Sequence, residues 1–225
     1  ACAQADAMIR GISQLNARRL GLRWRELVLG PESACDDHPS PRAATPGSRH
    51  MVGLLFADFA SFRRLDERML PRYYRELMTP IAALINACGD RVLVRKTWGD
   101  ALHLVTADAE TAAQLAIEIQ AFIEKRRLRR KDLLGDLELR IAAHYAPAYR
   151  GFDPIESKKT SFGTQLLFTA RIEPVAPPGM IYVTEAFAAQ LALECGGAFA
   201  LDYAGEIELA KRFGTYRLFA LRQPL

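Results

Sequence analysis

Residues 52–62, Val-Gly-Leu-Leu-Phe-Ala-Asp-Phe-Ala-Ser-Phe, form a nearly continuous apolar run that contains a single acid, Asp58. A run of this kind is typical of a buried strand. A second stretch, residues 91–105 (Arg-Val-Leu-Val-Arg-Lys-Thr-Trp-Gly-Asp-Ala-Leu-His-Leu-Val), contains two β-rich runs joined at Gly99 and Asp100, which predicts a hairpin. Each stretch therefore places an aspartate at the edge of a buried sheet.

Aspartates in such positions are costly to desolvate unless a cation or a hydrogen-bond donor meets them. Hard divalent cations such as Mg²⁺ are usually held by one or two carboxylates together with substrate phosphates. A lone aspartate, by contrast, is more often a turn residue or a helix cap. Asp58 and Asp100 therefore indicate a metal site only together with other motifs.

Further motifs accompany these two acids along the chain. They are Phe56-Ala-Asp-Phe-Ala-Ser-Phe62, Lys96-Thr-Trp-Gly-Asp100, Thr160-Ser-Phe-Gly163 with Thr169-Ala-Arg171, Pro178-Gly-Met-Ile-Tyr-Val-Thr-Glu185, and Gly205-Glu-Ile-Glu-Leu-Ala-Lys211. In this order they resemble the catalytic domain of class III nucleotide cyclases, the family of adenylate and guanylate cyclases. The resemblance covers about residues 51 to 222 and indicates the fold strongly.

The order of apolar patterns predicts an α+β fold with an antiparallel-rich sheet and helices packed on it, close to the ferredoxin-like plan. Helices are expected over residues 65–87, 109–126, 163–172 and 185–193. Pro80 predicts a kink in the first of them. Strands are expected over 137–149, 181–184 and twice near the C-terminus, with a loop over 150–160.

The chain has 225 residues, of which 50% are hydrophobic, enough for one sizeable core. Residues 1–50 are expected to hold an N-terminal helix (5–29) for packing or dimerisation, followed by a linker rich in proline and serine. The catalytic domain is expected to span residues 51–225.

Charge and cysteine usage narrow the class of protein. The net charge is +4, and its main cluster, residues 126–131, has no interleaved aromatic residues, so we expect a solvated helix end and no nucleic-acid partner. The four cysteines show no CxxC spacing, which is typical of reduced thiols. No apolar run is long enough for a membrane span. We expect a cytoplasmic protein without a membrane partner.

The resemblance implies an activity. In this family the ribose 3′-hydroxyl of a nucleoside triphosphate attacks its own α-phosphate, and a 3′,5′-cyclic mononucleotide and pyrophosphate form. The resemblance assigns two Mg²⁺ or Mn²⁺ ions per site to Asp58 and Asp100, because in-line displacement needs charge neutralisation on both oxygens. The backbone after Asp58 is expected to hold the triphosphate. The residues concerned are Phe59, Ser61, Phe62 and Arg63, of which Ser61 and Arg63 replace the family's glycine and threonine.

Two more positions, Arg171 and Leu167, correspond to catalytic groups of the family. Arg171 matches the arginine that stabilises the transition state, and its planar fork suits the charge on the α-phosphoryl oxygens. Leu167 stands where the family has asparagine and cannot donate a hydrogen bond. Losing one such donor typically costs about 10²- to 10³-fold in rate. Lys211, in a late basic segment, fits an approach to the outer phosphates and an exposed lysine near a turn equally well.

The choice of base rests on Lys96 and Thr160, which occupy the family's adenine-reading lysine and aspartate positions. Trp98 replaces an isoleucine and, by strand alternation, shares a face with Lys96. An indole there would narrow the base pocket, although core packing explains it equally well. Together with the missing acid, this favours UTP or CTP slightly over ATP. The chain also resembles the stand-alone pyrimidine cyclases of bacterial anti-phage signalling.

In the resembled family the active form is a dimer, with the metal acids from one protomer and the arginine and base-reading residues from the other, so a homodimer with composite sites is expected.

Two other functions remain open for this chain. Leu167 would instead suit a catalytically silent domain kept for nucleotide binding or dimerisation. An RNA-binding ferredoxin-like module needs exposed aromatic residues on the sheet and a basic face, and the strands show neither clearly.

Overall fold

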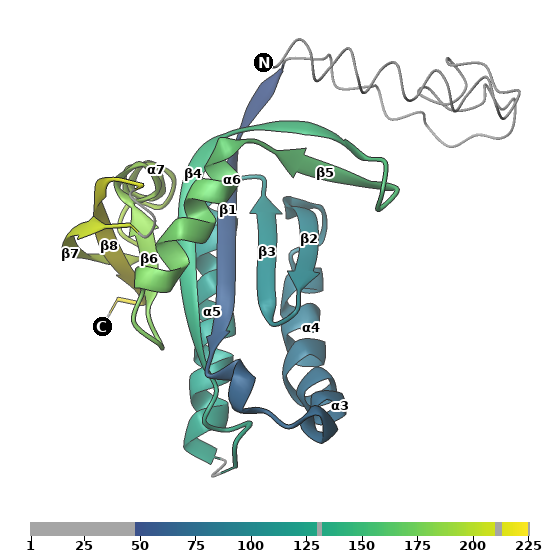
Figure 1. Cartoon of the computed structure of the whole chain (residues 1–225). Coiled ribbons are helices and arrows are strands. Elements are labelled where there is room, and N and C mark those ends of the chain that lie inside the picture. The colour runs from purple at the N-terminus through teal and green to yellow at the C-terminus, as the bar shows by residue number, and fades with distance from the viewer. Residues whose placement is uncertain (1–47, 130–131, 210–212, 225) are drawn as a thin grey trace, which may run out of the picture. The chain divides into compact units, whose positions relative to one another are not determined.

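Strand β1 (Arg49–Ala60) lies at the centre of the fold, which a computed structural model describes for residues 48–129, 132–209 and 213–224 (Figure 1). The predicted N-terminal helix and its linker up to residue 47, and Lys211, lie outside the described residues. The other strands are β2 (Val92–Trp98), β3 (Ala101–Thr106), β4 (Glu138–Asp153), β5 (Lys158–Phe162), β6 (Ile181–Thr184), β7 (Ala200–Glu208) and β8 (Thr215–Arg222).

The sheet has eight strands in the order β2-β3-β1-β4-β6-β8-β7, and β5 pairs with β4 beside this path. The β4–β6 pair is parallel and the other pairs are antiparallel. The α-helices are α3 (Leu70–Tyr73), α4 (Thr79–Ala87), α5 (Ala109–Arg129), α6 (Thr164–Ile172) and α7 (Glu185–Cys195). The predicted α+β architecture with an antiparallel-rich sheet is confirmed.

Helices cover both faces of the sheet, and the alternation along β1 decides which side chain meets which helix. Leu55, Ala57 and Phe59 are buried with residues of α4, α5 and α7. Val52 and Leu54 point to the opposite face, where α6 packs. Asp58 follows the same alternation and so lies on the α6 face.

Gly53 marks the closest approach between β1 and the start of α5. A Cβ atom there would lie 2.6 Å from the backbone oxygen of Asp108 and would also clash with Thr106 Oγ1. Gly53→Ala should therefore lower the free energy of unfolding by about 1–3 kcal/mol, the usual cost of overpacking. Urea denaturation monitored by circular dichroism measures this change. An unchanged midpoint would contradict the tight packing.

The expected helix over residues 65–87 is broken into shorter pieces. A 3₁₀ turn, η2 (Glu67–Met69), precedes α3, and a π-helical turn, η3 (Tyr74–Met78), joins α3 to α4. Pro80 has no N–H to donate to the carbonyl of Glu76, so the regular α-helical ladder cannot continue there. The hydroxyl of Thr79 donates to the carbonyl of Tyr74 at 3.0 Å. The predicted kink is thus a π-helical turn.

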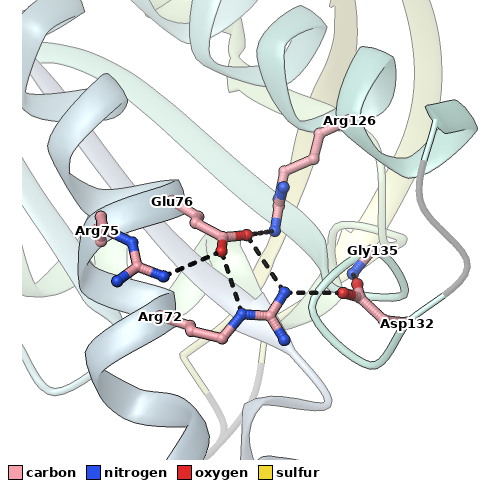
Figure 2. A network of polar contacts seen from close by, with 6 residues as sticks. All are labelled: Arg72, Arg75, Glu76, Arg126, Asp132 and Gly135. Atoms are coloured by element: carbon pink, nitrogen blue, oxygen red, sulfur yellow. Dashed lines mark hydrogen bonds and ion pairs between the residues drawn. The ribbon is translucent and has the colours of Figure 1, made fainter.

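An ion-pair network ties this turn to α5 (Figure 2). Glu76 accepts from Arg72 Nε at 3.1 Å and from Arg126 Nη2 at 2.9 Å, and Arg72 also reaches Asp132 at 3.0 Å. The sequence placed Arg126 in a solvated basic run, but its side chain is only 10% exposed. The expectation of a solvated helix end was wrong at this residue, because Glu76 draws its guanidinium inward.

The segment expected as a loop over 150–160 instead forms the end of β4 and the start of β5. The two strands pair from Tyr149↔Phe162 to Asp153↔Lys158, and the rings of Tyr149 and Phe162 stack at 5.4 Å between centroids. Pro147 lies in the part of β4 that has a neighbouring strand on one side only, where a residue without an N–H is tolerated. The β4–β5 hairpin arches over β2 and β3 (Figure 1).

Candidate active site

Asp58 and Asp100 come together at one end of the central strands. Asp58 follows the last β1–β3 pair, Ala57↔Leu102, and Asp100 lies in the two-residue turn between β2 and β3, where Gly99 adopts φ +64°. Burial, and then the charge of Asp100, raise the pKa of Asp58 to about 6. The predicted pairing of these two acids is what the register of the strands produces.

A second acid and an arginine lie beside this pair. Arg140 faces Asp58 across the β1–β4 register, and its Nη1 atom lies 3.9 Å from Glu173 Oε1. Glu173 is only 5% exposed, and its burial, followed by the charge of Asp58, raises its pKa to about 7. The positive charge of Arg140 lowers the pKa of both Asp58 and Glu173 and so offsets part of these increases. Sequence reasoning missed Arg140 and Glu173; the only signal was an acid inside the apolar segment that follows Arg171.

The arrangement of Asp58 and Asp100 fits a Mg²⁺ or Mn²⁺ site. Two mutually repelling carboxylates in a half-buried position are relieved by a divalent cation, and such ions usually complete their shell with phosphates and water. Over residues 48–129, 132–209 and 213–224, no group of three or more His, Cys, Asp or Glu side chains could hold a metal by itself.

Metal binding here should depend on pH, because protons compete for Asp58. Its raised pKa means that the folded apo protein binds this proton more tightly than the unfolded chain does. The resulting stability is fully present below about pH 4 and is lost as the pH rises through about 6. Binding of Mn²⁺ displaces the proton, so the rise in Tm caused by Mn²⁺ should be larger at about pH 7.5 than at about pH 5. Thermal melts with and without Mn²⁺ measure this, and an equal rise at both pH values in wild type would contradict it. Asp58→Asn should show little rise.

The segment after Asp58 is a short 3₁₀ turn, η1 (Phe62–Arg64), rather than the start of a long helix. The side chain of Phe59 is in the core, and the rings of Phe59 and Phe62 lie edge-on to Tyr73 at 5.5 and 4.9 Å. Among the expected phosphate-binding residues, Phe59 and Phe62 could therefore contribute only backbone groups. Ser61, with φ 69°, and Arg63 are exposed.

Helix α6 carries Leu167 and Arg171 one turn apart. Leu167 is 63% exposed and lines a cavity of about 520 Å³. Arg171 is half-buried and, in the described part of the chain, makes no ion pair. A guanidinium without a carboxylate partner is free to meet a phosphate, as the prediction for Arg171 requires.

The 520 Å³ cavity lies between β2, β3, β5 and α6, and it brings Lys96 and Trp98 together. Trp98 is 86% exposed, so it is not a core residue. Thr160 does not line the cavity, whereas its neighbour Ser161, which is 6% exposed, does. Successive residues of a strand face opposite sides, so only one of these two can face this cavity. The base-reading role of Thr160 stays a prediction.

A separate cavity of about 390 Å³ lies between the starts of α6 and α7. Its buried His144 is bonded through Nδ1 to Thr184 Oγ1 at 2.8 Å and through Nε2 to Gln165 Oε1 at 3.0 Å. No residue predicted for the active site lines it. Both ring nitrogens are used within the fold, which indicates a structural histidine.

A family model for the adenylate and guanylate cyclase catalytic domain matches residues 45–222. The chain belongs to this family. It is therefore homologous to adenylyl and guanylyl cyclase domains, which are nucleotidyl cyclases, and the resemblance found in the sequence is confirmed. A search of curated proteins gave no match.

Solved structures of cyclase domains share the fold. The guanylate cyclase domain of RhGC from Catenaria anguillulae in complex with GTP is 18% identical, with a TM-score of 0.65 over 80% of this chain and 100% of that one. The adenylyl cyclase CyaB from P. aeruginosa is 14% identical, with a TM-score of 0.65 over 79% and 96%. A rhodopsin-guanylyl cyclase core with converted specificity, in complex with ATPαS, is 20% identical, with a TM-score of 0.63 over 78% and 97%. None of the helices among the described residues is long and apolar enough to cross a membrane.

Proposed function

We propose that this cyclase domain converts a nucleoside triphosphate into a 3′,5′-cyclic mononucleotide and pyrophosphate, with Mg²⁺ or Mn²⁺ held by Asp58 and Asp100. The observation that carries the proposal is the pairing of these two carboxylates at one end of the sheet, where burial and repulsion leave them in need of a cation. Two bound ions would activate the 3′-hydroxyl and neutralise charge on the phosphates.

The chain's own residues supply the rest of the site. Arg171, unpaired within the described ranges, would stabilise the charge that gathers on the α-phosphoryl oxygens. Arg140 lies between Asp58 and Glu173 and would hold Asp58 in position without meeting the substrate. Backbone N–H groups near Ser61 and the exposed Arg63 would bind the outer phosphates.

We propose further that two protomers form the sites between them. Several large apolar side chains are exposed on the α6 side and along the β4–β5 hairpin: Trp98, Phe152, Ile155, Phe162 and Leu167. Exposed apolar groups of this size usually mark an interface. The occupant that fits is a second copy of the chain. The guanylyl cyclase domain of the RhoGC fusion protein from Blastocladiella emersonii is described as a non-canonical dimer in one solved structure and as a monomer in another.

For the base, a pyrimidine remains the proposal, and Trp98 is its support, since this side chain lines the cavity next to Lys96. Adenine is the alternative, because Lys96 occupies the family's adenine-reading position. A role in anti-phage signalling rests on the resemblance to pyrimidine cyclases alone, and a cytoplasmic location on the cysteine usage. To test the anti-phage role, cells that carry wild type or Asp58→Ala are infected with phage, and their cyclic nucleotides are measured.

The central experiment is a product assay. Purified protein is incubated with each of the four ribonucleoside triphosphates and Mn²⁺ or Mg²⁺, and products are identified by chromatography and mass spectrometry. A cyclic mononucleotide from at least one substrate is the expected result. Cyclic UMP or cyclic CMP as the main product would support the pyrimidine proposal, and cyclic AMP would overturn it. No product under any condition would favour the silent, nucleotide-binding alternative.

Leu167→Asn tests whether the missing amide limits the rate. The side chain is exposed and lines the cavity, so an amide fits there without disturbing the core. Restoring one donor to a transition state should raise kcat, by up to about 10²-fold, with a smaller effect on KM. Steady-state kinetics measure both parameters, and Leu167→Ala serves as the control without an amide. An unchanged kcat would mean that this site is built differently from the family's.

A further inference from the structure

Lys96 is neutralised within its own protomer by two acids, Asp153 at the end of β4 and Glu156 in the turn that follows. Its Nζ atom lies 3.3 Å from Asp153 Oδ2 and 3.0 Å from Glu156 Oε1. The side chains of Lys96 and Asp153 are about one-quarter exposed, at 26% and 25%. The ammonium of Lys96, which can only donate hydrogen bonds, and the carboxylate of Glu156, which can only accept them, therefore lie side by side at the wall of the 520 Å³ cavity.

Asp153 holds this turn in shape. Its Oδ1 atom accepts from the backbone N–H groups of Ile155 at 2.9 Å and Glu156 at 3.2 Å. These bonds, and then Lys96, hold the pKa of Asp153 below its usual range, so it stays ionised at neutral pH. Both of its oxygens are thus occupied. Glu156 differs from Asp153 in two ways. Its side chain lines the cavity, and among the described residues it accepts a hydrogen bond through Oε1 only.

The cavity holds further polar groups that suit a planar, polar ligand. His103 lies next to Lys96 in the β2–β3 register, and its Nε2 atom is buried without a hydrogen-bond partner among the described residues. Burial, with a contribution from Lys96, lowers the pKa of His103 to about 4, so the ring is neutral at pH 7. A buried polar atom without a partner needs an explanation, and a ligand in the cavity supplies one. The rings of Phe56 and His103 lie 6.3 Å apart between centroids.

We propose that Glu156 determines base specificity by accepting an N–H of the nucleobase, with Asp153 as the residue that positions it. The hydrogen-bonding edge of every nucleobase has an acceptor atom next to an N–H donor, but the order of the two differs between bases. The exocyclic atom accepts and the ring nitrogen donates in uracil and guanine, and the reverse holds in adenine and cytosine. Lys96 and Glu156, held in place by the β4–β5 turn, complement one of these orders, the ammonium donating to the acceptor and the carboxylate accepting from the N–H. Glu156 thereby supplies the acid that is missing at Thr160. This inference rests on the proposed nucleotide cyclase function.

The test compares kcat/KM for the four nucleoside triphosphates in wild type and in variants. Glu156→Ala should change the ratio between the preferred and the next substrate by about tenfold or more, the usual worth of one good base contact. Glu156→Gln keeps one acceptor oxygen and should retain more of the preference. Asp153→Asn weakens the turn and should reduce the preference by less than Glu156→Ala does. Glu124→Ala, an exposed acid on α5, is the matched control and should change nothing.

An analogue of the preferred substrate without an N–H on the base edge sharpens the test; it carries one methyl group on a ring N–H, or two methyl groups on an exocyclic amino group. Wild type should lose about tenfold or more in kcat/KM on this analogue, and Glu156→Ala should lose little, because the acceptor is already gone. Equal losses in both proteins, or an unchanged base ranking in Glu156→Ala, would overturn the proposal and leave Glu156 as a surface ion-pair residue.

Failure of the proposed function has a different signature. If wild type forms no product from any substrate, the cyclase proposal fails, but the role of Glu156 can still be measured by binding. Calorimetry with 3′-deoxynucleoside triphosphates, which lack the attacking hydroxyl, gives Kd values for each base. A base preference in wild type that disappears in Glu156→Ala supports the inference. A preference that persists, or no preference in wild type, contradicts it.

Discussion

Replacing Asp58 or Asp100 by alanine is expected to abolish measurable turnover. Loss of one charge-stabilising group costs about 10²- to 10³-fold in other enzymes, and each substitution here would also remove a ligand of the metal. The same substitutions should leave the Tm of the apo protein unchanged or raise it. The reason is that Asp58 is half-buried beside Asp100, and removing either carboxylate removes their repulsion when no metal is present.

The measurements are product formation with Mn²⁺ and thermal melts without it. Asp90→Ala is the matched control, since Asp90 is an exposed acid close to the hairpin in sequence. This variant should keep wild-type activity and stability. Full activity in Asp58→Ala or Asp100→Ala would rule out the metal assignment, and a large fall in Tm would mean that the acids serve the fold.

Mixing two inactive variants is expected to restore activity if the sites lie between protomers. Asp58→Ala loses its metal acid and Arg171→Ala loses its transition-state arginine, so a mixed dimer keeps one intact site. Random exchange gives half mixed dimers with one of two sites intact, so about one-quarter of the wild-type rate should return.

The matched control for this experiment mixes Asp58→Ala with Asp100→Ala. Both acids come from the same protomer in the proposed arrangement, so no mixed dimer has an intact site and no activity should return. Subunit exchange is checked by mass spectrometry of the mixture. Absence of recovery in the first mixture, with exchange proven, would mean that each protomer works alone.

Local patterns explain why much of the fold could be predicted from the sequence. The apolar run around Asp58, the hairpin at Gly99 and the amphipathic pattern of α5 each specify their own element. The pairing of Asp58 with Asp100 also follows, because the register that joins β1 to β3 places a strand end beside the hairpin turn. Strand β5 could not be predicted, because its sequence Lys-Lys-Thr-Ser-Phe is polar and its strand character depends on pairing with β4.

The contacts around the predicted site depend on residues far apart in the chain. The bond between Lys96 and Glu156 exists because a hairpin end arches over another hairpin, and the contact of Arg140 with Glu173 joins β4 to the residue after α6. No spacing rule connects such pairs. Strand alternation could indicate that Thr160 and Ser161 face opposite sides, but not which of them faces the cavity.

The central pairing of β1 with β4 has a consequence for how the chain folds. The two strands pair over twelve positions, from Arg49↔Tyr149 to Ala60↔Glu138, and β2, β3 and α5 lie between them in the sequence. The β2–β3 hairpin can form early and pair with one edge of β1, whereas the other edge of β1 must wait for β4, which leaves the ribosome much later. Until then its apolar edge is exposed to chaperones and to other nascent chains. Translation that stops before β4 would therefore leave an aggregation-prone fragment, in which Asp58 never meets Arg140.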